Sequence, residues 1–492
     1  MAITSSLAVL GAIVLYLCWR LLFWLRHDPL STAPKAHWSV PYSGLWIWWQ
    51  HFHDRSAEVV HQAHLHHGPV VRLAPAELSV CSVGGGLDVI YSFKEAMPKT
   101  DWYQAANAFG EEPMVAIIDE APHKQRKKLL AQPYMKTSIR NNQTWLDAQP
   151  RLTKSLARAL ESMATPSSET DFYDLVFGWS VDSITEYLFG QSASMDLLAD
   201  LAKARQTRQE YETQRANQFL PLPTMLLHRL GFRPELAWVE DMQAAGENES
   251  HTVYQHMRLA MTSANKKGSA PTPLSAKERA ILLSEMQDHV VAAVDTTAIL
   301  LTACAWQLSL PSNQTWQTRL RDEVRTAGSP TLGADLEPLP ILDAITKEVL
   351  RLHTPLAGRQ PRRTHRPVVL GPPGHQLTVP AGVTVHSQAQ TLHRSPAFPD
   401  AETFDPARWL DTPPEALKEM ERWYWPFGSG SRACTGTQLG IDNLKLAIAT
   451  LYGRFATETV EGSIFATSRG ILAMPIRKDG YYLRLRVQAV EG

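Results

Sequence analysis

The sequence predicts a mainly helical fold with small β-sheets, organised as a single domain around one long central helix. Three observations lead to this class. The stretch from about residue 140 to 360 follows a mostly helical pattern of apolar residues. Only short segments near residues 68–80 and 366–400 carry the β-branched and turn residues typical of strands. No internal repeat, and no linker long enough to separate two domains, interrupts this order.

The composition is that of an ordinary globular protein. Of the 492 residues, 44% are hydrophobic and 20% are charged, which excludes a largely disordered or collagen-like chain. The formal net charge of -1 gives no electrostatic reason to expect nucleic acid as a partner. The four cysteines form no CxxC pair, so a reduced, cytosol-facing compartment is the simplest interpretation.

The N-terminus predicts a single transmembrane anchor over residues 1–27. Leu7–Leu25 is mostly apolar and nearly supplies the roughly 20 residues that span a bilayer. A cleaved signal peptide is the alternative, but the segment lacks a basic start and a clear cleavage site. Arg20, Arg26 and Lys35 lie on its C-terminal side, so the positive-inside rule places the rest of the chain in the cytosol.

The elements that follow the anchor are expected in a simple order. Pro29, Pro34 and Pro41 make residues 28–45 a stiff connector to the domain formed by residues 46–492. Residues 68–80 predict a short hairpin. Helices then dominate from 140 to 360, apart from a loop at 264–274, and residues 366–400 return to extended structure.

A long helix is predicted between residues 275 and 308. Ser275 and Glu278 have the spacing of a capping box, and Pro311 marks the end. At 1.5 Å per residue, roughly 33 residues give about 50 Å, enough to cross a whole domain. The helix contains Ala292–Thr297, in which one Asp and two Thr are poor helix formers. This stretch is either a polar patch on the solvent face or a local distortion where a carboxylate and a hydroxyl meet a bound ligand.

One cysteine lies in a glycine-rich loop, Phe427–Gly436. Glycines on both sides of Cys434 allow the backbone to approach a flat cofactor and to point N–H groups at the sulfur. Arg432 adds a positive charge that can pair with a cofactor carboxylate and favour a thiolate. The N-terminus of a helix predicted from residue 438 to 451 would also favour a thiolate. The alternative is a buried structural cysteine, the commoner fate of an isolated Cys.

This loop resembles the haem-binding loop of the cytochrome P450 family, Phe-x-x-Gly-x-Arg-x-Cys-x-Gly. Every fixed position of that motif is matched, by Phe427, Gly430, Arg432, Cys434 and Gly436. The resemblance implies the cytochrome P450 fold as a single catalytic domain. It also implies haem b as the cofactor, with the Cys434 thiolate as the axial ligand of the iron.

Two further motifs follow the family order. Glu348 and Arg351 resemble its Glu-x-x-Arg pair, and Arg408, before Trp409, resembles the arginine that completes a buried structural network with them. The Ala292–Thr297 stretch resembles the oxygen-activation motif, which implies that Asp295 and Thr296 relay protons. This sequence departs from the motif at Ala293, where the family usually has Gly, and the added methyl could narrow the oxygen groove.

The resemblance also suggests which residues contact the haem carboxylates. His123 begins a segment similar to the family's C helix, in which either Arg126 or Lys127 would contact one propionate. Arg362 resembles a second propionate contact. Arg126 and Lys127 belong to a basic run from Lys124 to Lys128. Such a run normally forms a solvated face, and here it is also a candidate docking surface for an acidic electron donor.

The implied activity is insertion of one oxygen atom into an apolar small molecule, with electrons from NADPH through a separate cytochrome P450 reductase, on the cytosolic face of the endoplasmic reticulum membrane. The sequence looks most like fungal members that modify secondary metabolites such as terpenoids, polyketides or alkaloids. Family position suggests a pocket that includes Trp102, Phe109, Phe219, Leu220 and Leu356. A haem-thiolate isomerase or dehydratase, and a non-catalytic haem electron carrier, remain as alternatives.

Overall fold

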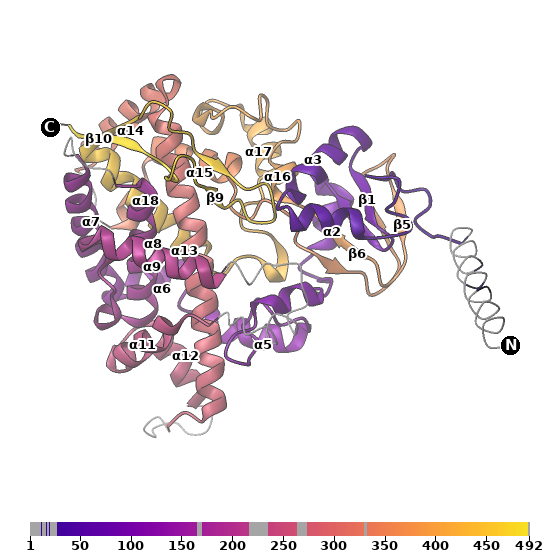
Figure 1. The fold of residues 1–492 in the computed structure, drawn as a ribbon, viewed down its shortest axis with the longest axis horizontal. Helices are drawn as coiled ribbons and strands as arrows, with labels where there is room; N and C mark the ends of the chain where they lie inside the picture. The colour runs from indigo at the N-terminus through magenta and orange to yellow at the C-terminus, as the bar shows by residue number, and fades with distance from the viewer. Residues whose placement is uncertain are drawn as a thin grey trace.

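The computed structural model describes residues 11, 16, 19, 27–164, 170–215, 235–262, 273–328 and 332–490. Figure 1 shows a large helical part beside a smaller part that contains the main sheet and the helices α2 (Leu45–Phe52) and α3 (Ser56–His67). The predicted class, mainly helical with small sheets, is confirmed. Most of the predicted anchor, all of the predicted loop at 264–274 except residues 273–274, and both Phe219 and Leu220 lie outside the described residues.

The long helix is α13, Ala276–Ser309. Ser275 caps it with the predicted capping box, in which the Ser275 side chain and the Glu278 side chain each bond the other's backbone. Within the described part of the chain, α13 is the one helix long and apolar enough to cross a membrane, but 72% of its most apolar window is buried in the protein. It is therefore the core helix of the domain, and the predicted boundaries are confirmed.

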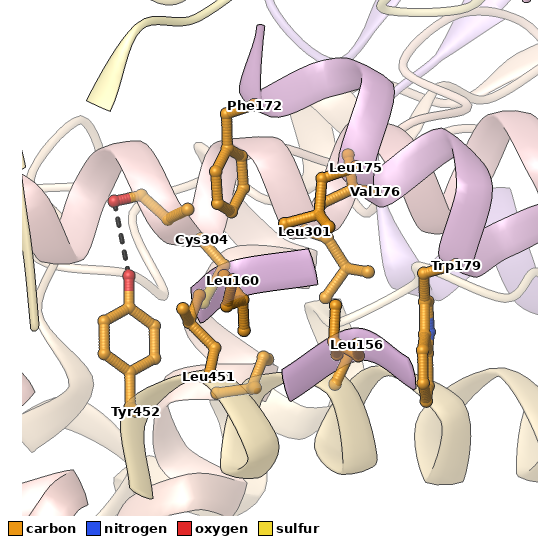
Figure 2. Close-up of a pocket in the computed structure, with 13 residues that line it drawn as sticks. Leu156, Leu160, Phe172, Leu175, Val176, Trp179, Leu301, Cys304, Leu451 and Tyr452 are labelled. Carbon is orange, nitrogen blue, oxygen red and sulfur yellow. Dashed lines mark hydrogen bonds between the residues drawn. The ribbon is translucent and has the colours of Figure 1, made fainter. Parts of the chain in front are cut away.

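The main core lies where α13 meets three other helices: α7 (Gln143–Met163), α8 (Phe172–Phe189) and α18 (Thr437–Arg454). Every residue of α8 is buried, as expected for a helix surrounded by others. Figure 2 shows how closely these helices pack: Leu160, Phe172 and Cys304 line a void of only about 20 Å³. The predicted helix at 438–451 corresponds to α18, which is one residue longer at its start and three longer at its end.

The main sheet has the order β1-β2-β6-β3. Strands β1 (Val70–Ala74) and β2 (Glu77–Val80) form the predicted hairpin. Strand β6 (Thr384–His386) is parallel to β2, and the short β3 (Arg362–Arg363) pairs antiparallel with β6. The extended structure predicted for residues 366–400 holds as far as β6, but α16 (Ala389–Leu392) follows, so the prediction is wrong for that turn of helix.

The remaining elements frame this core and sheet. The helices are α4 (Asp88–Ile90), α5 (Glu120–Ala131), α6 (Lys136–Asn141), α9 (Leu201–Arg215), α11 (Ala237–Ala245), α12 (Val253–Thr262), α14 (Gln314–Thr326), α15 (Pro340–Leu352) and α17 (Pro414–Trp423). The strands are β4 (Val368–Leu370) with β5 (Leu377–Val379), β7 (Phe455–Thr459) with β10 (Leu485–Ala489), and β8 (Ala466–Thr467) with β9 (Pro475–Ile476).

The segment predicted as a connector, residues 28–45, is irregular up to Gly44 but packs on the domain. Asp28 forms a buried ion pair with Arg72 of β1, with 2.5 Å between Oδ2 and Nη1. Leu30 and Val40 are 1% and 0% exposed. The domain therefore begins at about residue 28, because these contacts make the connector part of its core.

Candidate functional site

The loop Phe427–Gly436 is held in a tight turn between α17 and α18. The Cys434 N–H donates to the Phe427 carbonyl at 2.9 Å and closes the turn. Gly430 has φ +72°, and a Cβ at that position would collide with the backbone oxygen of Tyr91. Only glycine is compatible with both conditions. The loop therefore keeps a fixed shape that presents the Cys434 side chain toward α13.

Cys434 is exposed, but to an internal cavity. The cavity has two adjoining lobes of about 390 and 270 Å³, within the range of small-molecule and cofactor sites. The cysteine loop, the core helix α13 and strand β3 of the main sheet all contribute residues to its walls. The walls of both lobes include Ala292, Thr296, Thr297, Phe427, Arg432 and Cys434.

The larger lobe is mostly apolar. Trp102 and Leu356 lie in its wall, as predicted from the sequence, together with Leu300 and Ile471. Phe109 instead packs at the margin of the main core and is not among the residues that line either lobe. The apolar wall suits a small molecule with little charge.

Among the described residues, five Lys and Arg side chains line this cavity: Lys99, Lys127, Arg359, Arg362 and Arg432. Arg359 is paired with Glu77. Arg362 donates to the Tyr103 hydroxyl at 2.7 Å. Arg432 donates to two backbone carbonyls, and its buried Nε has no hydrogen-bond partner. An unpartnered guanidinium N–H at a cavity wall indicates room for an acceptor that a ligand would bring.

The basic side chains at the cavity repel one another, which makes the charged form of each less favourable. Burial and the nearby Arg362 lower the pKa of Arg432 to about 10. Burial, with Arg432 and Arg362, pushes the pKa of Lys99 well below its ordinary value. His123 lines the same cavity, and burial with Lys99 lowers its pKa to about 3, so it is neutral. A bound carboxylate would relieve this repulsion, so these residues fit a flat apolar cofactor that carries carboxylates, such as haem.

Two residues that line the cavity, Lys99 and Tyr103, were not predicted from the sequence. Lys99 donates to the Val115 and Met114 carbonyls at 2.7 and 3.2 Å, and it lines both lobes of the cavity. Tyr103 lies in the larger lobe and bonds Arg362. Neither belongs to a motif, and no spacing in the sequence connects them to residues more than 250 positions away.

Arg126 and Lys127, either of which was predicted to contact a haem propionate, make different contacts. Arg126 is committed to Glu285 of α13, with 2.6 Å between Nη1 and Oε2. Lys127 Nζ donates to the Ser431 carbonyl of the cysteine loop at 2.8 Å and lines the smaller lobe. Lys127 is therefore the residue of this pair that faces the cavity.

The environment of the Cys434 sulfur differs from the prediction. Burial raises its pKa, while the Gly436 N–H, the Thr437 hydroxyl and Lys127 act in the opposite direction. The net direction favours the thiol in the protein alone. Lys127 is the neighbouring cation that lowers the pKa of this sulfur most clearly. A contribution of Arg432 to the thiolate stays a prediction. A metal ion would have to supply the remaining stabilisation of the thiolate.

The Ala292–Thr297 stretch faces the cavity from α13, so it is not a solvent-exposed patch. Thr296 donates its hydroxyl to the Ala292 carbonyl at 2.7 Å, and Asp295 beside it is 3% exposed. The predicted local distortion is absent, because the helix continues without a break from Ala276 to Ser309. Ala293 is half-buried and lines the smaller lobe, so its methyl group does occupy the space that Gly would leave open.

A carboxylate near this stretch was also missed. Asp288 lies in the walls of both lobes, and burial with the neighbouring Glu285 raises its pKa to about 7. The helical repeat could have revealed it, because Asp288, Ala292 and Asp295 are spaced i, i+4 and i+7 and so share one face.

Glu348, Arg351 and Arg408 form one buried network. Glu348 Oε1 accepts from Arg351 at 2.7 Å and from Arg408 at 3.0 Å. The indole N–H of Trp409 donates to the other oxygen at 2.9 Å. Arg351 also donates to the carbonyls of His393, Ala401 and Thr403. The network joins α15 to the segment that leads to the cysteine loop.

Comparison with known proteins gives a consistent result. The family model described as Cytochrome P450 matches residues 34–479. The chain is 27% identical to the cytochrome P450 monooxygenase tazI of Aspergillus terreus, over 87% of this chain and 88% of that protein. It is 27% identical to the fusicoccadiene 8-ol C-16 hydroxylase of Alternaria brassicicola, over 98% of both chains. It is 24% identical to the tryprostatin B 6-hydroxylase of Neosartorya fischeri, over 92% of this chain and 80% of that protein.

Proposed function

This chain belongs to the cytochrome P450 family of oxidoreductases, and from that premise we propose that it is a haem-thiolate monooxygenase with Cys434 as the axial ligand. It inserts one oxygen atom from dioxygen into an apolar small molecule. The observation that carries the proposal is the cavity at Cys434, where one sulfur, an apolar wall and several basic side chains meet. Haem b supplies the oxygen chemistry when bound, and thiolate ligation favours cleavage of the O–O bond.

The residues of this chain have separate tasks in that reaction. Arg362, Arg432 and Lys127 would hold the carboxylates of the haem, with neutral His123 as a further contact. Thr296 faces the cavity with a hydroxyl that is fixed by the Ala292 carbonyl. A hydroxyl held in this way can pass a proton into the cavity, and the buried Asp295 next to it can supply one.

The substrate is proposed to be an intermediate of fungal secondary metabolism: a terpenoid, a polyketide or an alkaloid. Two relatives from fungi are named as hydroxylases of small molecules, tryprostatin B and fusicoccadiene 8-ol. The apolar wall formed by Trp102, Leu300, Leu356 and Ile471 supports a substrate of low polarity. Binding there would exclude water from the reacting atoms and would orient one C–H bond toward the haem.

The electrons are proposed to come from NADPH through a separate cytochrome P450 reductase, with the domain held on the cytosolic face of the endoplasmic reticulum by the anchor at 1–27. Of the predicted basic run on α5, Lys124 and Lys128 are exposed, whereas Arg126 and Lys127 are occupied inside the protein. The docking surface for an acidic donor would therefore use Lys124 and Lys128.

The reduced, carbon-monoxide difference spectrum of the expressed protein tests this proposal. We expect the strongly red-shifted Soret band of a thiolate-ligated haem, and complete loss of that band in Cys434→Ala. Cys304→Ala is the matched control, because Cys304 is buried in the main core and does not line the cavity at Cys434. A red-shifted band in Cys434→Ala, or a band at the ordinary position in the parent protein, would refute the assignment.

A further inference from the structure

Arg359 is a charged side chain in the mostly apolar wall of the larger lobe, and it has no part in the proposed haem contacts. The backbone is fixed on both sides of it. The Gly358 N–H donates to the Ile471 carbonyl at 2.9 Å, and the Gln360 N–H donates to the Ser387 carbonyl at 3.2 Å. A Cβ at position 358 would lie only 2.6 Å from the Ile471 Cα, so this approach requires glycine. Arg359 therefore projects from a rigid segment, which holds a polar group in a defined place.

A buried carboxylate balances the charge of Arg359. Its Nη1 donates to Glu77 Oε1 at 2.6 Å, and the two side chains are 17% and 12% exposed. Burial alone would raise the pKa of Glu77, but Arg359 and His386 hold this pKa well below its ordinary value. The Nε2 atom of His386 lies 3.3 Å from the same carboxylate oxygen. The pair therefore consists of a cation and an ionised carboxylate, with no net charge.

Two buried histidines near this pair add no charge. Burial, followed by the nearby Arg359, lowers the pKa of His51 to about 3. Burial also lowers the pKa of His386, which is fully buried in β6. Both imidazoles are therefore neutral near neutral pH. Arg359, Glu77, His51 and His386 together have no net charge, so this part of the wall does not attract anions over long range.

Arg359 has more donors than the protein satisfies. A guanidinium carries five N–H donors and no acceptor. Among the described residues, the bond to Glu77 is the one hydrogen bond of this side chain, and the buried Nε has no partner. Unpaired N–H groups cost free energy unless a bound molecule supplies an acceptor. The larger lobe thus offers a fixed hydrogen-bond donor within an apolar wall.

The charge balance decides which acceptor fits. A carboxylate on the substrate would share one guanidinium with Glu77, and like charges that share a site repel each other. A carbonyl or hydroxyl oxygen accepts a hydrogen bond without adding charge, and a charged donor strengthens that bond. The rest of the wall, with Trp102, Leu300 and Leu356, suits a hydrocarbon skeleton. The molecule that fits is therefore a neutral hydrocarbon skeleton that already carries an oxygen.

We propose that Arg359 is a specificity residue that binds a carbonyl or hydroxyl oxygen already present on the substrate. The proposal rests on the haem-thiolate function put forward for the cavity and narrows its substrate class. A bare hydrocarbon has no acceptor for Arg359. This enzyme therefore acts after a reaction that leaves an oxygen on the skeleton, either an earlier oxygenation or a condensation that retains a carbonyl. Glu77 is a positioning residue, which orients the guanidinium and cancels its charge.

Equilibrium dialysis with three rigid probes tests this role in the full-length holoenzyme. Adamantane, 2-adamantanone and 1-adamantanecarboxylate share one cage and differ in the oxygen that they carry. The double variant Arg359→Met/Glu77→Gln removes both charges together, so that neither is left buried without its partner. Arg363→Met is the matched control, because Arg363 is an exposed arginine on the neighbouring strand β3 and does not line the cavity.

The measured quantity is the dissociation constant of adamantane divided by that of 2-adamantanone, because the cost of removing each probe from water is the same for every variant. We expect this ratio to fall about ten-fold or more in the double variant, through loss of a hydrogen bond to a charged donor. It should keep the parent value in Arg363→Met, and the parent should bind the carboxylate more weakly than the ketone. An unchanged ratio in the double variant, an equal fall in Arg363→Met, a parent that does not bind the ketone, or tighter binding of the carboxylate would overturn the proposal.

Arg359→Lys is the second variant, to be used if the double variant does not fold. It keeps a cation beside Glu77 but lacks the planar fork that serves Glu77 and the cavity at once, so the ratio should fall in the same direction. A parent-like ratio in Arg359→Lys would then count against the proposal.

Dialysis does not depend on the haem spectrum, so the carbon-monoxide band of the same sample judges the proposed function separately. Protein with the thiolate-type band and an unchanged ratio in the double variant would refute the role of Arg359 and leave the haem-thiolate assignment intact. A fall in the ratio, in protein whose carbon-monoxide band lies at the ordinary position, would support the role of Arg359 and refute the haem-thiolate assignment.

Discussion

Residues that are adjacent in sequence near the Cys434 cavity make different contacts and so have different roles. Arg126 and Lys127 are adjacent in sequence, yet the first is paired with Glu285 and the second reaches the cysteine loop. Successive residues on a helix point about 100° apart, which lets these two adjacent cations reach different partners. The same geometry puts Thr296 at the cavity wall, next to a carboxylate that is almost completely buried.

Thr296→Ala should separate oxygen consumption from product formation. Loss of the hydroxyl removes the proposed proton donor but leaves the haem contacts in place. We expect an unchanged carbon-monoxide band and a fall of roughly ten-fold or more in product per NADPH, with hydrogen peroxide released instead. The measurement is the ratio of product, peroxide and NADPH in a reaction reconstituted with reductase.

Thr302→Ala is the matched control for that variant. Thr302 lies on the same helix and makes the same type of bond, from its hydroxyl to the Ala298 carbonyl at 2.6 Å, but it is buried and does not line the cavity. It should couple NADPH to product like the parent protein. Equal coupling in Thr296→Ala and the parent would mean that protons enter by another route, for which Asp288 is the first candidate.

At the scale of elements, α15 and the segment before the cysteine loop are joined by charge as well as by packing. Glu348 is fully buried between two arginines, so its charge is balanced only while both partners stay in place. Buried ion pairs of this kind add little net stability, but removing one partner leaves the others buried with an unbalanced charge. The network therefore acts as a constraint on geometry: it keeps α15 and the segment that leads to the cysteine loop in a fixed relation.

Glu348→Gln should destabilise the protein by about 3–5 kcal/mol, because Arg351 and Arg408 would keep their charges in a buried site without a counter-charge. The expected result is a lower denaturant midpoint and a reduced haem content in purified protein. Glu419→Gln is the control, because Glu419 pairs with Arg422 at the surface, where such pairs contribute about 0–1 kcal/mol. If both variants unfold at the same denaturant concentration, the network has no such role.

For the whole molecule, the proposed arrangement has one membrane-spanning segment and one folded domain that begins at Asp28. The ion pair of Asp28 with Arg72 and the burial of Leu30 belong to the domain and do not require the preceding residues. The long apolar helix α13 is the core of that domain, so it does not provide a second span. Attachment to the membrane would then depend on the N-terminal segment.

Removal of residues 1–27 should leave a folded domain that binds haem but is no longer an integral membrane protein. We expect an unchanged carbon-monoxide band, and release of the truncated protein from membranes by alkaline carbonate, whereas the full chain resists extraction. Extraction of the full chain under the same conditions would exclude a spanning anchor.

The features that the sequence determined by itself are those that depend on residues close together in the chain. The capping box of Ser275 and Glu278, the hairpin at 68–80 and the fixed spacing around Cys434 each involve a few adjacent residues. Local hydrogen bonds and glycine conformations decide such features, and they are the same whatever the rest of the protein does. The family resemblance rests on these short motifs as well.

Only the tertiary structure decided which distant side chains meet at the cavity. Lys99 and Tyr103 join Arg362 and Arg432 there because the main sheet and the cysteine loop bring segments more than 250 residues apart into contact. Likewise, the tertiary structure pairs Arg126 with Glu285, so that Arg126 does not face the cavity. Burial also changes the pKa of Cys434 more strongly than the neighbouring charges do. Burial and long-range contact are properties of the folded chain, so no local pattern could have predicted them.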